Sequence, residues 1–141
     1  MDNAVIHEEA FNLLCGELLG EGAFRKVFAC TIDPALVVKV ETRTGSFHNV
    51  QEWRTWDECQ FWKKGAAWLA PCVSISPYGT VLLQKRVEPL RKAELPEKMP
   101  AFMRDVKAEN FGLYEGRVVC SDYAFVASIL PIKPKKFGWD A

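Results

Sequence analysis

Residues 18–40 read LLGEGAFRKVFACTIDPALVVKV, and this stretch decides the fold. It holds three short runs of β-prone residues, at Leu18–Leu19, Lys26–Ile32 and Leu36–Val40. A glycine-rich turn separates the first two runs, and Asp33-Pro34 marks a turn before the third. The stretch therefore predicts three strands of an antiparallel meander.

The flanking sequence extends this prediction. Glu8–Leu19 has the apolar spacing of a short helix that runs into the first strand. Asn49–Lys64 carries an apolar stripe typical of a longer helix, which we expect Gly65 to end. Two further strands are predicted at Cys72–Ser76 and Thr80–Lys85. The expected fold class is α+β: a five-stranded antiparallel sheet with one main helix.

The second half of the chain is predicted to be less regular. Val87–Pro100 contains three prolines and cannot form one regular helix. Phe111–Cys120 resembles a small hairpin with a turn at Glu115-Gly116. The tail after Ile129 is expected to be extended or frayed.

Composition limits the classes of function. The chain has 141 residues, about one domain, and is 49% hydrophobic, which argues against a wholly disordered chain. Its formal net charge is zero, so it has no field that would attract nucleic acid or an acidic membrane. No apolar run reaches the roughly 18 residues of a membrane span, and the N-terminus lacks the pattern of a secretion signal.

The chain has five cysteines, and no two of them form a CxxC pair. Their spacing does not supply the close pairs of ligands that a zinc site uses. Free thiols in a reducing compartment are the simplest interpretation, so we expect a cytoplasmic protein. Cys30 and Cys120 lie in apolar runs and are expected to be packing residues.

Three features of the first half suggest chemistry, and each has a plain alternative. Gly20 and Gly22 would let the backbone approach phosphate oxygens, or they simply make a hairpin turn. Lys39 is either buried with a partner or faces solvent on a one-sided sheet. Glu52 either pairs with the Lys39 ammonium or closes a capping box with Asn49.

The second half contains the string Asp105-x-Lys107-x-x-Asn110, and Asp122 ends an apolar strand 12 residues later. An aspartate can accept the proton of an attacking hydroxyl, and a lysine can neutralise charge on a moving phosphate. Asparagine and aspartate oxygens are ligands that Mg²⁺ accepts. This set of side chains suits phosphoryl transfer; the plain alternative is that the string by itself forms a solvated turn.

In this order, the glycine turn, strand lysine, helix glutamate, Asp-x-Lys-x-x-Asn string and strand aspartate resemble the protein-kinase family, over roughly residues 18–127. Met103-Arg104-Asp105 resembles the family's His-Arg-Asp motif, and Asp122-Tyr123-Ala124 resembles its Asp-Phe-Gly motif. Thr80–Val87 resembles the strand that enters the adenine-binding hinge.

The resemblance implies a set of site residues for ATP and Mg²⁺. It implies catalytic roles for Asp105, Lys107, Lys39 and Glu52, and metal ligation by Asn110 and Asp122. It implies nucleotide binding by Gly20, Gly22, Lys39, Gln84, Lys85 and Val87.

The chain departs from the family at several points. Met103 and Ala124 stand where the family has histidine and glycine, and few residues remain for the usual C-lobe helices. The resemblance therefore implies a single minimal kinase-like domain over 1–141. Its parts would be an N-lobe-like region (18–87), hinge, catalytic and metal loops (88–127), and a tail (128–141). It is similar to short kinase-like proteins encoded by phages and bacterial mobile elements, which would place it in a bacterial host cytoplasm.

Two functions are expected from this resemblance. The first is a kinase-like phosphotransferase acting on a protein hydroxyl or on itself, with a protein partner or self-association in place of the missing C-lobe. The alternative is a pseudokinase-type module that inhibits or modulates a host or partner protein. Trp139, in the lysine-bearing tail, is a candidate contact residue for such a partner.

Overall fold

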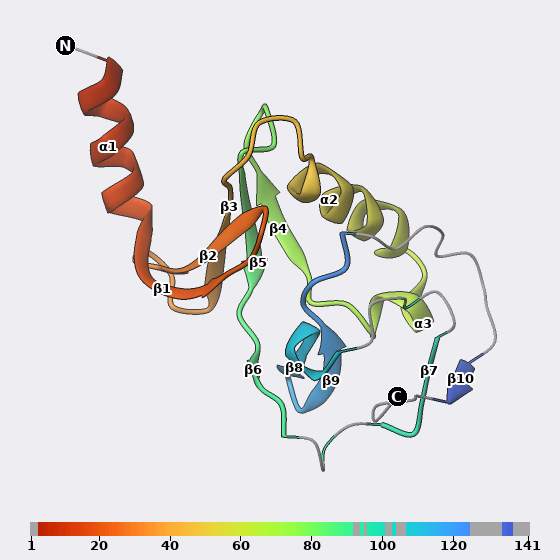
Figure 1. The fold of residues 1–141 in the computed structure, drawn as a ribbon. Coiled ribbons are helices and arrows are strands. Elements are labelled where there is room, and N and C mark those ends of the chain that lie inside the picture. The colour runs from red at the N-terminus through yellow and green to blue at the C-terminus, as the bar shows by residue number, and fades with distance from the viewer. Residues whose placement is uncertain are drawn as a thin grey trace. The chain divides into compact units, whose positions relative to one another are not determined.

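The computed structural model describes residues 3–91, 94, 96–100, 103, 107–124 and 134–136 (Figure 1). The chain divides into two compact units. The first takes residues 1–49 and 73–86, and the second takes residues 50–72 and 87–141. The prediction of a single domain stays a prediction.

The first unit is built on a five-stranded sheet with the strand order β1-β2-β3-β5-β4. Its strands are β1 (Cys15–Glu21), β2 (Arg25–Cys30), β3 (Leu36–Glu41), β4 (Cys72–Ile75) and β5 (Val81–Lys85). The pairs β1–β2, β2–β3 and β3–β5 are antiparallel. The expected α+β fold with a five-stranded antiparallel sheet is confirmed.

Apolar side chains of neighbouring strands form the core of this sheet. Cys30, Leu36 and Val38 are buried together, and Phe28 and Leu83 pack against them. Cross-strand register explains the cluster, because Phe28 lies opposite Val38 and Val38 lies opposite Leu83. Cys30 is a packing residue, as predicted.

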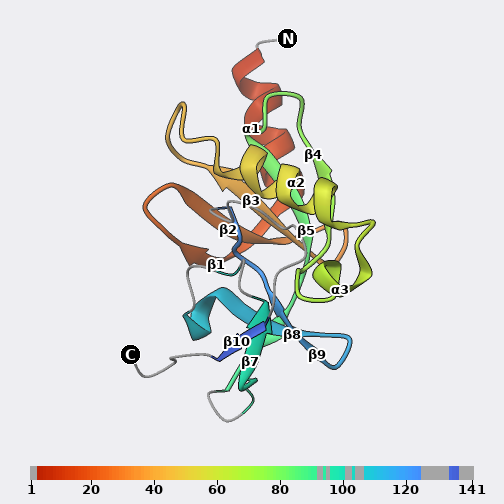
Figure 2. The ribbon, with the colours of Figure 1, turned by 90° about the vertical axis from the view of Figure 1, so that its right-hand side faces the viewer.

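The N-terminal helix ends earlier than its periodicity predicted. Helix α1 spans Asn3–Leu14, and β1 begins at once with Cys15. Cys15 already pairs with Cys30 of β2, so strand pairing replaces the helical pattern at this point. Figures 1 and 2 show α1 extending away from the sheet, and Phe11 near its end contacts the ring of Phe28 edge-on.

The prediction of one helix over Asn49–Lys64, ended by Gly65, was wrong in its second half. Helix α2 spans His48–Cys59, and a separate short helix, α3, spans Lys63–Ala66. Gly65 lies inside α3, where a Cβ would come within 2.3 Å of the Trp62 ring and 2.7 Å of the Cys59 sulfur. The glycine therefore allows close packing between two helices and does not end one.

The second unit contains two small sheets. One has the order β6-β8-β9, and the other pairs β7 with β10. Their strands are β6 (Glu88–Pro89), β7 (Lys98–Pro100), β8 (Phe111–Tyr114), β9 (Arg117–Cys120) and β10 (Pro134–Lys136). As expected, residues 87–100 form no regular helix where they are described.

The predicted hairpin over Phe111–Cys120 is confirmed, turn included. Glu115 and Gly116 have φ values of 50° and 78°. Two consecutive residues with positive φ make a turn whose twist matches that of the flanking strands. The hairpin is tied to the end of the α3 region, because Ala70 N–H donates to the Cys120 carbonyl (2.9 Å) and Cys120 N–H donates to the Trp68 carbonyl (2.7 Å).

All five cysteines are free thiols, as expected from their spacing. Burial and the nearby Glu58 carboxylate raise the pKa of the Cys59 thiol to about 11. Cys120 is buried, as predicted for a packing residue. Within the described part of the chain, no helix has both the length and the apolar character needed to span a membrane.

Gly112 in β8 offers a test of the packing inside the second unit. A Cβ at this position would lie 2.5 Å from the Val87 side chain and 2.7 Å from the Glu88 carbonyl oxygen, whereas a Cβ at Gly20 would meet nothing within 4 Å. We expect Gly112→Ala to lower the free energy of unfolding by about 1–3 kcal/mol. The control Gly20→Ala should change it by less than about 0.5 kcal/mol. Urea denaturation measures both, and equal stabilities would contradict the packing described.

Candidate functional site

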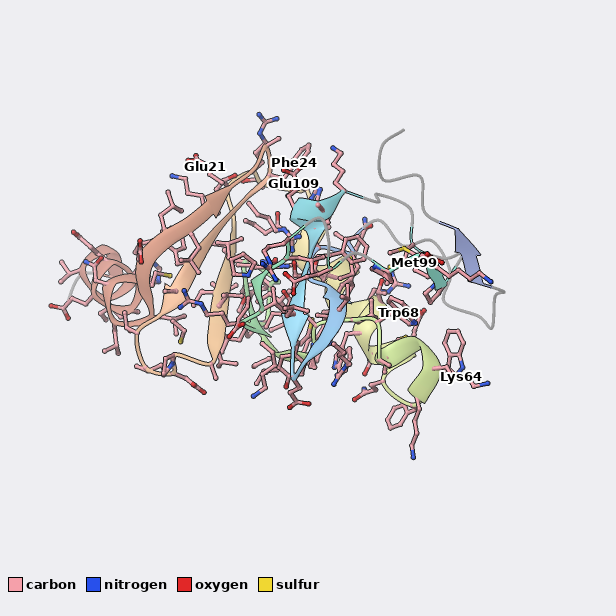
Figure 3. The ribbon with its side chains drawn as sticks, turned by 90° about the horizontal axis from the view of Figure 1, so that it is seen from below. Glu21, Phe24, Lys64, Trp68, Met99 and Glu109 are labelled. Atoms are coloured by element: carbon pink, nitrogen blue, oxygen red, sulfur yellow. The ribbon has the colours of Figure 1, made fainter. Side chains whose placement is uncertain are left out.

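The glycine-rich turn forms the tip of the β1–β2 hairpin, where Figure 3 labels Glu21 and Phe24. Gly22 N–H donates to the Arg25 carbonyl (2.9 Å) and closes the turn. Neither Gly20 nor Gly22 has a positive φ, and a Cβ on Gly22 would come no closer than 3.9 Å to any atom. Neither backbone conformation nor internal packing therefore requires glycine at positions 20 and 22.

Lys39 lies in β3, the central strand of the sheet, between Val27 of β2 and Leu82 of β5. Only 4% of its surface is exposed. The solvent-facing alternative is therefore wrong. The reason is that Leu36–Lys39 are all buried, so β3 is covered on both of its faces and is not the one-sided strand that alternation suggested.

Asn49 is fully buried and connects β2, β3 and the residue just before β5 in the first unit. Its side-chain amide donates to the carbonyls of Lys39 and Thr80, both at 3.0 Å. Its side-chain oxygen accepts a hydrogen bond from Arg25 (3.1 Å). The capping-box interpretation is therefore wrong, because this side chain holds strands together and does not cap α2. No signal in the sequence identified the contact between Arg25 and Asn49.

Glu52 belongs to the second unit and is completely buried. One of its carboxylate oxygens accepts a hydrogen bond from the backbone N–H of Tyr123 (3.3 Å). A buried carboxylate needs such donors, because an unsatisfied charge is costly in an apolar interior. Lys39 belongs to the first unit, and its pairing with Glu52 stays a prediction.

The two predicted metal ligands come to the same end of the β8–β9 hairpin. Phe111 lies opposite Cys120, so the residues just outside this pair also face one another. The Asn110 carbonyl accepts hydrogen bonds from the N–H of Ser121 (2.8 Å) and from its hydroxyl (3.2 Å). Asp122 follows directly and is exposed, whereas Asn110 is buried. Glu109, labelled in Figure 3, marks the short 3₁₀ turn Ala108–Asn110 that leads into β8.

Tyr123 anchors the segment that follows Asp122. Its hydroxyl donates to the Ala70 carbonyl (2.7 Å) and lies 3.1 Å from the Cys72 sulfur. Its backbone N–H is the donor to Glu52. The ring is almost fully buried, as is Ala124. Hydrogen bonds of both the backbone amide and the side chain of Tyr123 therefore hold the backbone directly after Asp122.

The remaining predicted residues of the catalytic loop are only partly described. Lys107 is exposed and precedes the 3₁₀ turn. Met103 is buried. Asp105, the predicted base, lies outside the described residues, as does Trp139.

Gln84 and Lys85 lie at the end of β5, and Val87 lies just beyond it. Gln84 is buried opposite Val37, and Lys85 is half-buried. Val87 is half-buried and is the side chain that a Cβ on Gly112 would strike. Their predicted contacts with a nucleotide stay predictions.

Asn110 and Asp122 carry side-chain oxygen atoms of the kind that Mg²⁺ accepts as ligands, and their role as metal ligands stays a prediction. Mg²⁺ usually keeps several waters and is held by one or two carboxylates together with substrate phosphates. Among the described residues, no group of three or more histidine, cysteine or acidic side chains could hold a metal ion.

Tyr123 offers a matched test of the anchoring. We expect Tyr123→Phe to lower the free energy of unfolding by about 1–2 kcal/mol, because the buried hydrogen bond from the tyrosine hydroxyl to the Ala70 carbonyl is lost. Tyr78 is 92% exposed, so Tyr78→Phe should have almost no effect. Thermal and urea denaturation of the two variants provide the comparison. A Tyr123→Phe protein as stable as the parent would refute the anchoring role.

Comparison with known proteins gives a limited result. No family model and no curated protein matches the chain. Among solved structures, the chain is similar to the aminoglycoside phosphotransferase APH(2″)-IIa in its ternary complex with streptomycin and ATP. The TM-score is 0.42 and the sequence identity 20%. The match covers 64% of this chain but only 30% of that protein, so the similarity is one of fold over part of the chain.

Proposed function

We propose that the chain is an ATP- and Mg²⁺-dependent kinase-like phosphotransferase of minimal size that acts on a protein hydroxyl or on its own hydroxyls. The observation that carries the proposal is the pair of hydrogen bonds from Ser121 to the Asn110 carbonyl. These bonds hold an asparagine and an aspartate at one end of a hairpin, although they are 12 residues apart in the sequence. The two residues that the proposal assigns to Mg²⁺ are thereby brought close to one another along the backbone.

In this proposal Asn110 and Asp122 hold Mg²⁺, which supplies positive charge to the phosphate oxygens. The hydrogen bond from Tyr123 N–H to Glu52 supports it, because it restrains the backbone directly after Asp122. A ligand whose neighbours are fixed loses less freedom when the metal binds.

The phosphates of the nucleotide are bound by the glycine turn and by Lys39. Open space around Gly20 and Gly22 supports this role, since nothing in the fold occupies the position that a Cβ would take. Backbone N–H groups of such a turn can donate to phosphate oxygens. The buried Lys39 ammonium contacts the α- and β-phosphates, and Glu52 orients it. Gln84, Lys85 and Val87 receive the adenine.

The chemical step transfers the γ-phosphoryl group to an acceptor hydroxyl. The oxygen of the hydroxyl forms a bond to the γ-phosphorus, and the bond to the β–γ bridging oxygen breaks, releasing ADP. Asp105 accepts the proton of the hydroxyl, and Lys107 neutralises charge on the phosphoryl oxygens. The acceptor must be held in line with the leaving group, and we assign this positioning to a protein partner or to a second copy of the chain.

Nucleotide binding gives a first test. A nucleotide at 100 times its Kd should stabilise the protein by about 2.7 kcal/mol. We expect a thermal shift with a non-hydrolysable ATP analogue and Mg²⁺ together, and little shift with Mg²⁺ alone. Lys39→Met and Asp122→Asn should still fold and should lose most of the shift.

Lys26→Met is the control for Lys39→Met, because Lys26 lies on the neighbouring strand and is partly exposed, next to Glu21 at 3.8 Å. It should keep the full shift. Equal shifts for the Lys39→Met, Lys26→Met and parent proteins would remove Lys39 from the binding site.

Catalysis is tested separately by phosphoryl transfer. Incubation with ATP labelled in the γ-phosphate should label the parent protein or an added protein acceptor. Asp105→Ala should reduce labelling by at least about 100-fold, as expected for loss of a general base. Equal labelling of the two proteins would overturn the assignment of Asp105.

A second candidate is a pseudokinase-type binding module that inhibits or modulates a partner protein. Exposed apolar side chains in the first unit favour it, since exposed apolar surface often marks interaction sites. They belong to α1 and β1: Val5, Ile6, Phe11, Leu13, Leu18 and Leu19. Absence of any thermal shift with nucleotide and Mg²⁺, together with absence of labelling, would favour this function over the phosphotransferase.

A further inference from the structure

Two cysteines, Cys15 and Cys30, face one another across the β1–β2 pair. They are direct Cα partners in the register of the two strands. Residues opposite one another in an antiparallel pair project to the same face of the sheet. This is the case here, because Cys30 belongs to the apolar cluster of the first unit and Cys15 packs against the same cluster.

The hydrogen-bond pattern shows which kind of pair they form. Thr31 N–H donates to the Leu14 carbonyl (3.0 Å). In an antiparallel ladder, hydrogen-bonded and non-hydrogen-bonded pairs alternate. Because Leu14 and Thr31 are linked by a hydrogen bond, the neighbouring pair Cys15–Cys30 is a non-hydrogen-bonded pair. The Cα atoms of such a pair are about 4.5 Å apart, closer than in the alternative pair. That separation falls within the range of about 4.4–6.8 Å that a disulfide spans.

Two further observations agree with this closeness. Gly16 follows Cys15, and a Cβ there would lie 3.2 Å from the Ala29 carbonyl oxygen, so the two strands approach tightly at this point. Burial and the neighbouring Cys30 raise the pKa of the Cys15 thiol. Cys15 is partly exposed, which leaves it open to a small reagent, whereas Cys30 is buried behind it.

We propose that Cys15 and Cys30 form a reversible thiol–disulfide site that pins the register of the β1–β2 hairpin. The register of this hairpin is irregular between Cys15 and Leu18 and again between Leu18 and Gly20. A covalent bond at the open end of the hairpin, opposite the glycine turn, removes the freedom of β1 to slide along β2. The inference stands whether or not the chain binds a nucleotide.

The oxidant is a low-molecular-weight disulfide. The Cys15 thiolate attacks one of its sulfurs, which breaks the S–S bond and releases one thiol after protonation. Cys30 then loses its proton and attacks the Cys15 sulfur of the mixed disulfide, releasing the second thiol. Two protein thiols and one small disulfide thus become one protein disulfide and two small thiols. An excess of a small thiol reverses the same exchange and returns both cysteines to free thiols.

The test treats the full chain with oxidised glutathione and then blocks the remaining thiols with an alkylating reagent in denaturant. We expect two of the five thiols to be protected, and dithiothreitol to restore all five. Trypsin cuts after Arg25 and Lys26, so the disulfide should link the peptide of residues 1–25 to that of residues 27–39. Five alkylated thiols, a lasting glutathione adduct on Cys15, or a link through another cysteine would each overturn the proposal.

Variants separate this site from the thiols of the second unit. Cys15→Ser changes a partly exposed residue and should abolish the link, whereas Cys59→Ala should leave it intact. Hydrogen exchange tests the pinning: amides of residues 15–30 should exchange more slowly in the oxidised parent than in the reduced parent. Oxidised and reduced proteins with equal exchange rates in this segment would show that the bond does not restrain the hairpin.

Discussion

The register of antiparallel strand pairing is the constraint on which the described structure depends. Side chains alternate between the two faces of a strand, so a slip of one residue would move every side chain to the opposite face. In the first unit the register sets Lys39 between Val27 and Leu82 and Cys15 against Cys30. In the second unit it sets Phe111 opposite Cys120. This pair brings Asn110, which precedes Phe111, to the same end of the hairpin as Asp122, which lies two residues after Cys120.

Each unit also buries polar groups whose hydrogen-bond partners strand pairing alone does not supply. Asn49 meets this need in the first unit, with hydrogen bonds to Arg25 and to the carbonyls of Lys39 and Thr80. Glu52 and the Tyr123 hydroxyl do so in the second. Buried polar groups are costly unless they are paired, and they favour one arrangement of the backbone over its alternatives. In the first unit these contacts include the backbone of Lys39, and in the second they include the residue directly after Asp122.

Local sequence signals predicted the elements that depend on local physics. The Glu115-Gly116 turn was recognisable because a two-residue hairpin turn requires residues that adopt positive φ. The strands around Phe28, Val38 and Leu83 followed from runs of β-prone residues. The helix errors arose where packing overrode periodicity, at Cys15, which pairs with β2, and at Gly65, which packs against Trp62.

For the candidate site, too, some properties could be predicted from local sequence and others depended on the fold. By itself, the sequence determined which side chains could carry phosphoryl-transfer chemistry and their order along the chain, because residue type and spacing are local properties. Only the tertiary structure decided that Lys39 is buried, that Asn49 binds strands and does not cap a helix, and that Asn110 lies beside Ser121. Burial and hydrogen-bond partners depend on segments distant in the sequence, and no local pattern encodes which of them will meet.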